Sequence, residues 1–91
     1  MSGSRKRTKK IVLTHHAEQK LEERRLKREW VEMAVRGPLW VEAEPRDHTA
    51  ERRFVVIEEF GGRILRVVCV ETEDAIRVIP ALFDRDARSN R

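Results

Sequence analysis

A pair of adjacent glycines, Gly61 and Gly62, separates two runs rich in β-branched residues and constrains this chain more than any other feature. Glycine accepts the positive φ angles that a type I′ turn requires, so the pair predicts a β-hairpin with a two-residue loop. Counting outward from that turn places Phe54 opposite Cys69. The chain then reverses direction at the acidic loop 71–74 and forms a third strand over residues 75–79.

Side chains alternate along these three strands, so the hairpin has two distinct faces. One face has the composition of a core, and we expect helices to cover it: Phe54, Val56, Phe60, Leu65, Val67, Cys69, Ile76 and Val78. The other face is mixed, with Arg53, Arg66, Arg77 and Glu59 among Val55, Ile57, Ile64, Val68, Val70 and Ile79. A small sheet with two helices leaves such a face at least partly open.

Two helices and two further strands are expected before the hairpin. In chain order they are a short strand at residues 11–13, helices at 15–25 and 28–36, and a half-buried strand at 39–44. Thr14 is a candidate N-cap, and Gly37 followed by Pro38 ends the second helix. The order β-α-α-β-β-β-β predicts an α+β fold in which two N-terminal helices cover one face of a small, mainly antiparallel sheet.

The length of 91 residues predicts one domain, which we place at residues 11–83 between a basic arm, 1–10, and a polar tail, 84–91. The only cysteine, Cys69, can form no internal disulfide and falls on the expected core face. No secretory segment and no apolar run long enough to span a membrane is visible. These features predict a cytoplasmic protein without membrane contact.

Charge is concentrated at the start of the chain. The net charge is +4, but five of the 20 basic residues precede residue 11, which leaves 15 basic and 16 acidic residues in the remainder. The five are Arg5, Lys6, Arg7, Lys9 and Lys10. Two interpretations stay open: an arm that contacts nucleic-acid phosphates non-specifically, and a disordered, solubilising leader.

Several kinds of catalytic site are excluded by what the chain lacks. His15 and His16 are adjacent, so on a helix they point about 100° apart, whereas chelating pairs favour i, i+4 spacing. No phosphate loop, nucleophile elbow or dinucleotide fingerprint is present. The serines lie in the tails and there is no tyrosine. We therefore expect neither a metal nor a cofactor, and no serine catalysis.

The arginines of the mixed face are the remaining candidates for chemistry. Arg53, Arg66 and Arg77, with His16 near a sheet edge, form a set that suits cleavage of the RNA backbone. The 2′-hydroxyl is the internal nucleophile, so the protein needs only an acid, a base and cations around the phosphorane. The alternative is structural: Glu59 lies diagonal to Arg66 in the expected register, within reach of a cross-strand ion pair.

The stretch THHAEQKLEERRLKREWVEMAVRGP resembles the opening of DUF4258, an uncharacterised bacterial family in the RelE/ParE toxin superfamily. The positions that carry the resemblance are Thr14, His16, Ala17, Lys20, Leu21, Arg24, Leu26, Val31 and Pro38. In the second half, GRILRVVCV and AIRVIPA are similar to strands of BrnT-type toxins. The resemblance spans about residues 11–83.

The resemblance implies a RelE-like fold and a toxin-like protein that acts on mRNA or the ribosome and is held in check by an antitoxin. It supports a functional role for Arg53, Arg63 and Arg77. It also implies that Arg24 and Arg63 contact nucleic acid together with the basic arm. The last strand departs from the family, where Ile-Thr or Ile-Ser precedes a tyrosine or arginine; Pro80-Ala81-Leu82 stands there instead. Proline cannot donate to a ladder and leucine cannot stabilise a phosphate, which counts against nuclease activity.

Three hypotheses about function follow. The first is a metal-independent ribonuclease toxin that acts on mRNA. The second is a non-catalytic binding module of the same fold, which inhibits a target by docking. The third is an interaction protein that forms a homodimer through the mixed face. This face has more apolar residues than a soluble monomer normally exposes.

Overall fold

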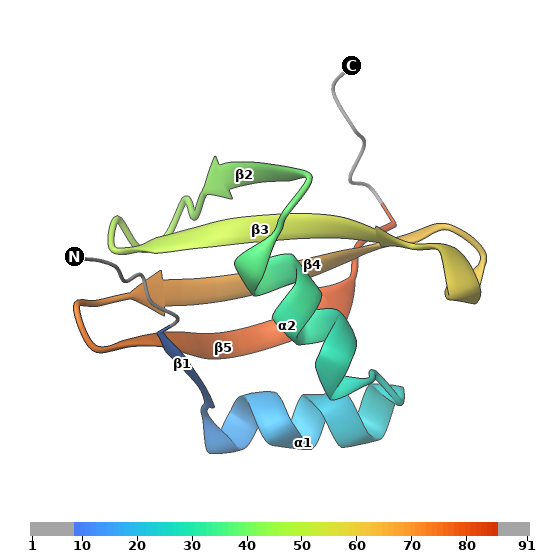
Figure 1. The fold of residues 1–91 in the computed structure, drawn as a ribbon, viewed down its shortest axis with the longest axis horizontal. Coiled ribbons are helices and arrows are strands. Elements are labelled where there is room, and N and C mark those ends of the chain that lie inside the picture. The colour runs from blue at the N-terminus through green and yellow to red at the C-terminus, as the bar shows by residue number, and fades with distance from the viewer. Residues whose placement is uncertain (1–8, 86–91) are drawn as a thin grey trace, which may run out of the picture.

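Two helices pack on one side of a five-stranded sheet (Figure 1). The computed structural model describes residues 9–85. In chain order the elements are β1 (Lys10–Leu13), α1 (His15–Arg24), α2 (Arg28–Arg36), β2 (Trp40–Ala43), β3 (Ala50–Ile57), a 3-10 turn η2 (Glu58–Phe60), β4 (Arg63–Glu71) and β5 (Ala75–Phe83). The sheet order is β1-β5-β4-β3-β2, with β1 parallel to β5 and all other pairs antiparallel. The expected α+β layout is confirmed.

Helix α1 begins where Thr14 leaves the sheet. The Ala17 backbone N–H donates to Thr14 Oγ1 at 3.1 Å, which satisfies one of the free N–H groups of the first turn. The helix ends at Arg25, which adopts a left-handed conformation with φ 56°. Its narrow apolar stripe, Ala17 and Leu21, is buried in the core that β5 also lines.

Helix α2 covers the middle of the sheet. Its buried residues are Trp30, Val31, Ala34 and Val35. They meet the inward faces of β3, β4 and β5, where Leu65, Val67 and Cys69 are fully buried. The expectation that these three residues lie in the core is confirmed. Burial raises the pKa of the Cys69 thiol to about 11.

The register of the central hairpin differs from the expected one. Both glycines have positive φ, 71° and 74°, but Glu58–Phe60 forms the η2 turn before them, so the strand already ends at Ile57. Ile57 therefore pairs with Arg63, where the two-residue loop predicted Phe60. In this turn the Phe60 ring stacks on Phe83, with centroids 4.9 Å apart, which is a tertiary contact that favours the observed conformation.

A shift of three residues exchanges the two faces of β3, because the side-chain period is two. Val55 and Ile57 belong to the core, whereas Phe54 and Val56 lie on the other face. The predicted placement of all four was wrong. The faces of β4 and β5 are as predicted at Leu65, Val67, Cys69, Ile76 and Val78.

Strand β5 is longer than expected and passes through Pro80. Cys69 pairs with Val78, where the prediction was Ile76, and Val67 pairs with Ala81. The ladder is irregular between these pairs, so β5 has one extra residue opposite Val68. Proline is tolerated at such a position because its missing N–H costs no ladder bond.

The two ends of the predicted domain are also adjusted. Residues 1–8 and 86–91 lie outside the described part of the chain, so most of the predicted arm and tail does too. The predicted arm included Lys9 and Lys10, but Lys10 begins β1 and Lys9 pairs with Glu71. In the described range, no helix is long and apolar enough to cross a membrane.

Candidate functional site

The side of the sheet opposite the helices is the candidate site, and we call it the uncovered face. It lies behind the sheet in Figure 1. Its apolar members, set by the observed register, are Val12, Trp40, Phe54, Val56, Ile64, Val68, Val70, Ile79, Pro80 and Leu82. Its charged members on the strands are Lys10, Glu42, Arg52, Arg66 and Arg77. The expected mixed composition therefore holds, although β3 contributes different residues.

The centre of the uncovered face is charged but internally neutralised. Arg52 Nε donates to Glu44 Oε1 at 2.9 Å, and an Arg66 terminal nitrogen donates to Asp84 Oδ2 at 3.0 Å. The hydrogen bond from Arg52 holds the pKa of Glu44 below its ordinary range. A depression of about 370 Å³ is lined by Glu44, Arg52 and Arg66. Its walls include Ile79 and Pro80.

Arg77 is the exception on this face. It is exposed, and it has no ion pair or side-chain hydrogen bond with any residue from 9 to 85. Its neighbours across the sheet are Val70 and Val12. Lys10 lies two residues before Val12 on β1, and its side chain is therefore on the same face. Together Arg77 and Lys10 form a small basic patch at one end of the sheet.

Arg53 lies on the helix side, so the prediction that it shares a face with Arg66 and Arg77 was wrong. Its guanidinium donates to the Val35 carbonyl at 2.8 Å, to Glu51 at 3.0 Å and to Glu71 at 2.8 Å. Burial alone would lower the pKa of Arg53, but the bonds to Glu71 and Glu51 outweigh it and raise the pKa above its ordinary value. All three nitrogens are occupied, and the residue is only 8% exposed.

The other two arginines of the predicted catalytic set are also apart. Arg66 is four residues from Val70 along β4, and Val70 pairs with Arg77. At about 3.3 Å per residue this separates the two positions by about 13 Å. The Arg66 guanidinium is also engaged by Asp84, so Arg66 and Arg77 do not form one cluster of free donors. His16, the fourth member of the set, is exposed on α1.

Arg24 fastens α1 to the sheet. One of its terminal nitrogens donates to the Ala81 carbonyl at 3.2 Å, just past the irregular segment of β5. At the other end of the helix, Thr14 Oγ1 donates to the Ile79 carbonyl at 3.2 Å. Thr14 and Arg24 thus hold both ends of α1 to carbonyls on either side of Pro80, which is a structural role.

Arg63 packs on aromatic rings at the hairpin end. Its guanidinium lies 5.3 Å from the Phe60 centroid and 5.9 Å from that of Phe83. A depression of about 410 Å³ borders this residue and Arg85. Arg63 is exposed and lies at the end of the sheet far from Lys10.

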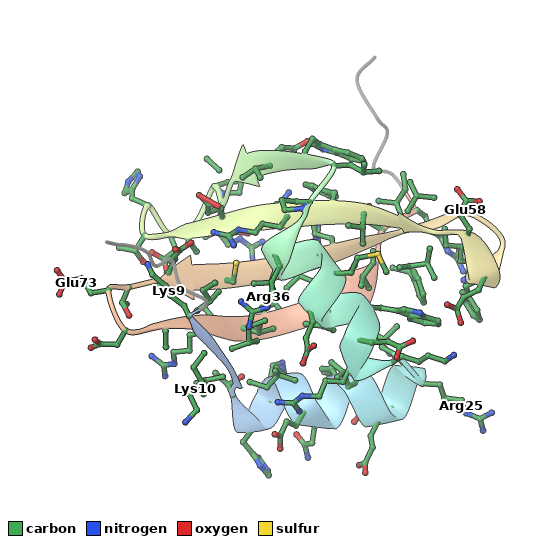
Figure 2. All side chains as sticks on the ribbon, in the orientation of Figure 1. Lys9, Lys10, Arg25, Arg36, Glu58 and Glu73 are labelled. Atoms are coloured by element: carbon green, nitrogen blue, oxygen red, sulfur yellow. The ribbon has the colours of Figure 1, made fainter. Side chains whose placement is uncertain are left out.

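The basic residues at the start of the chain divide into two groups. Arg5, Lys6 and Arg7 lie outside the described residues. Lys9 Nζ pairs with Glu71 at 2.8 Å, and its carbonyl accepts from Arg36 at 3.0 Å. In Figure 2, Lys10 points away from the sheet at the same end of the molecule as Lys9.

Sequence reasoning missed the charge network of the uncovered face. Arg52 was not predicted there because the register placed Arg53 instead, and neither Glu44 nor Asp84 carried a recognisable signal. Arg66 does form a structural ion pair, as the alternative interpretation held, but its partner is Asp84 and not Glu59. Glu59 pairs with Lys27 at 2.8 Å. Over residues 9–85, no three His, Cys, Asp or Glu side chains are grouped so that they could hold a metal ion.

The architecture defines an α+β domain whose two helices cover one face of a five-stranded sheet and leave the other open. Residues 13–83 match DUF4258, described as a domain of unknown function, and the chain belongs to this family. A comparison with curated proteins found no match, and neither did a comparison with solved structures.

Proposed function

We propose that this protein is a toxin-like domain of RelE/ParE type that binds RNA through its phosphates and acts by docking, without cleaving the strand. The proposal combines the sequence resemblance to RelE/ParE and BrnT-type toxins with the arrangement of the basic residues. An antitoxin-like protein partner would be expected to cover the same surface.

One observation carries the choice of docking over cleavage: the predicted catalytic arginines are separated. Arg53 is engaged with Val35, Glu51 and Glu71 on the helix side. Stabilisation of a phosphorane requires preorganised donors around one group, at hydrogen-bonding distance. The arrangement of Arg53, Arg66 and Arg77 does not supply this.

Phosphate contact is supported by the basic patch at the β1 end. Arg77 and Lys10 lie on the same face, and the chain that leads into Lys10 carries Arg5, Lys6 and Arg7. Arginine suits phosphate contact because it stays charged and presents a planar fork of donors. The uncovered face beside the patch is mostly apolar or neutralised, so we place the RNA backbone along the β1 and β5 end.

The test is the salt dependence of binding to a fluorescent single-stranded RNA, followed by anisotropy. Each lost phosphate contact lowers the magnitude of the negative slope of log K against log salt by about 0.7 for a single strand. We expect that decrease for Arg77→Ala and for Lys10→Ala, and a larger one when residues 1–8 are deleted. None of these changes should lower the melting temperature appreciably.

The matched control is Arg28→Ala, which removes the same charge from an exposed position at the start of α2. It should leave the slope unchanged. Equal slopes for Arg77→Ala, Lys10→Ala and the parent would refute phosphate contact at this patch. A decrease for Arg28→Ala equal to that for Arg77→Ala would show that net charge alone governs binding.

A further inference from the structure

The edge strand β2 and its flank carry apolar surface that the RNA-docking proposal does not use. Two of the five most exposed large hydrophobic residues within residues 9–85 lie here: Leu39 at 64% and Val41 at 47%. The sequence predicted a half-buried strand here, and Val41 lies on the helix side, where it pairs with Arg53. However, α2 packs mainly on β3 and β4, and Leu39 and Val41 stay exposed.

The outer edge of β2 also has free backbone groups. β2 is the last strand of the sheet, as its position along the upper edge in Figure 1 shows. The Glu44 N–H donates to the Ala50 carbonyl, so alternation along the ladder directs the backbone groups of Val41 and Ala43 away from β3. Proteins normally protect such an edge with lysine, proline or a bulge, and β2 has none of these within Trp40–Ala43.

We propose that β2 pairs antiparallel with β2 of a second copy of this chain, with the two-fold axis at Val41. The occupant is a second copy because the strand is complementary to itself in this register. Val41 then faces the partner's Val41, and Leu39 faces the partner's Ala43. On the other side of the ladder, Trp40 faces the partner's Glu42.

Charge disfavours the registers with the axis at Glu42 or Ala43, and an axis at Trp40 would set Glu42 opposite the partner's Pro38, which offers no donor. With the axis at Glu42, the two Glu42 carboxylates would lie directly opposite each other. With the axis at Ala43, Glu42 would face the partner's Glu44. Like charges directly opposite destabilise a strand pair. Only the axis at Val41 pairs Glu42 with an indole, and Trp40 Nε1 already donates to Glu42 Oε2 at 3.1 Å within one chain.

This dimer differs from one formed through the uncovered face. It extends the sheet edge to edge and leaves Arg77 and Lys10 free at the opposite edge. Because β2 is four residues long, the backbone ladder is short, and the apolar side chains must supply much of the association energy. The dimer should therefore be weak and concentration-dependent.

The experiment is disulfide trapping of Val41→Cys. Directly opposed residues in a hydrogen-bonded antiparallel pair have Cα atoms about 5.5 Å apart, which lies within the range that a disulfide spans. Cys69 is fully buried and does not compete. Under mild oxidation the Val41→Cys variant should migrate as a dimer on a non-reducing gel, and it should revert to a monomer with reductant.

The matched control is Val12→Cys, which puts a thiol on β1 at the other edge of the sheet, where the native residue is 39% exposed. It should remain largely monomeric under the same conditions. A second measurement is sedimentation equilibrium: the parent's average mass should rise with concentration, and Val41→Lys should abolish the rise. Equal trapping of the two cysteine variants, or a parent that stays monomeric at every concentration, would overturn the proposal.

Discussion

Replacing Arg53 by alanine distinguishes a structural arginine from a catalytic one. The side chain makes one buried bond to the Val35 carbonyl and two bonds to carboxylates that are 43% and 39% exposed. A buried bond from a charged donor contributes about 1.5–3 kcal/mol, and pairs with exposed carboxylates contribute about 0.2–1 kcal/mol each. We therefore expect Arg53→Ala to lower the free energy of unfolding by about 2–5 kcal/mol.

For a domain of this size, each kcal/mol shifts the melting temperature by about 4–8 °C, so the expected decrease is at least about 8 °C. The assay is thermal and urea denaturation followed by circular dichroism. Arg77→Ala is the control, and it should change stability by less than about 0.5 kcal/mol because the residue is exposed and unpaired within residues 9–85. An Arg53→Ala variant that melts with the parent would refute the assignment of Arg53 to the fold.

Three further predictions concern stability and reactivity. The hydrogen bonds from Lys9, and then from Arg53, hold the pKa of the Glu71 carboxyl below its ordinary range. Stability should therefore fall as pH drops below about 4.3, because the carboxylate is then protonated and loses these partners. In acid titrations of the melting temperature, Glu71→Gln should weaken that dependence. Val67→Asp should leave no folded protein, because an unpaired carboxylate would replace a residue with no exposed surface; a native-like melting curve would contradict this. Cys69 should resist alkylation at pH 8 until denaturant is added, and fast labelling of the native protein would show that its burial is wrong.

The element order was predictable because each element has a local signal. Thr14 begins α1, Gly37 and Pro38 end α2, and the Gly61-Gly62 pair marks the turn between the long strands. The core faces of β4 and β5 were also predictable, since their alternation alone separates apolar from polar positions. These predictions required no knowledge of which residues contact each other over long range.

The register was not predictable in the same way. The three residues that leave the strand before Gly61 do so because Phe60 packs on Phe83 and Trp30, and because Glu59 pairs with Lys27. These partners are far away in the sequence. Two adjacent glutamates, Glu58 and Glu59, were the only local sign, since glutamate is depleted in strands.

Because the register of β3 was predicted wrongly, the residues of the candidate site on β3 were also predicted wrongly. One displaced strand moved Arg53 into a buried network and brought Arg52 to the uncovered face in its place. A site assembled from several strands is therefore less predictable than the fold that carries it. The face of Arg77 was predicted correctly, because Arg77 lies on β5, which β3 does not touch. The position of Lys10 beside it was not predicted, because Lys10 was assigned to the arm.

The central claim, docking without cleavage, is tested most directly by incubating the 91-residue chain with end-labelled single-stranded RNA in the presence of a metal chelator. Binding and RNA length are read from the same samples on native and denaturing gels. The account predicts a shifted complex in which the RNA stays full length. RNA fragments ending in a 2′,3′-cyclic phosphate, formed by the parent protein and lost in Arg77→Ala, would contradict it.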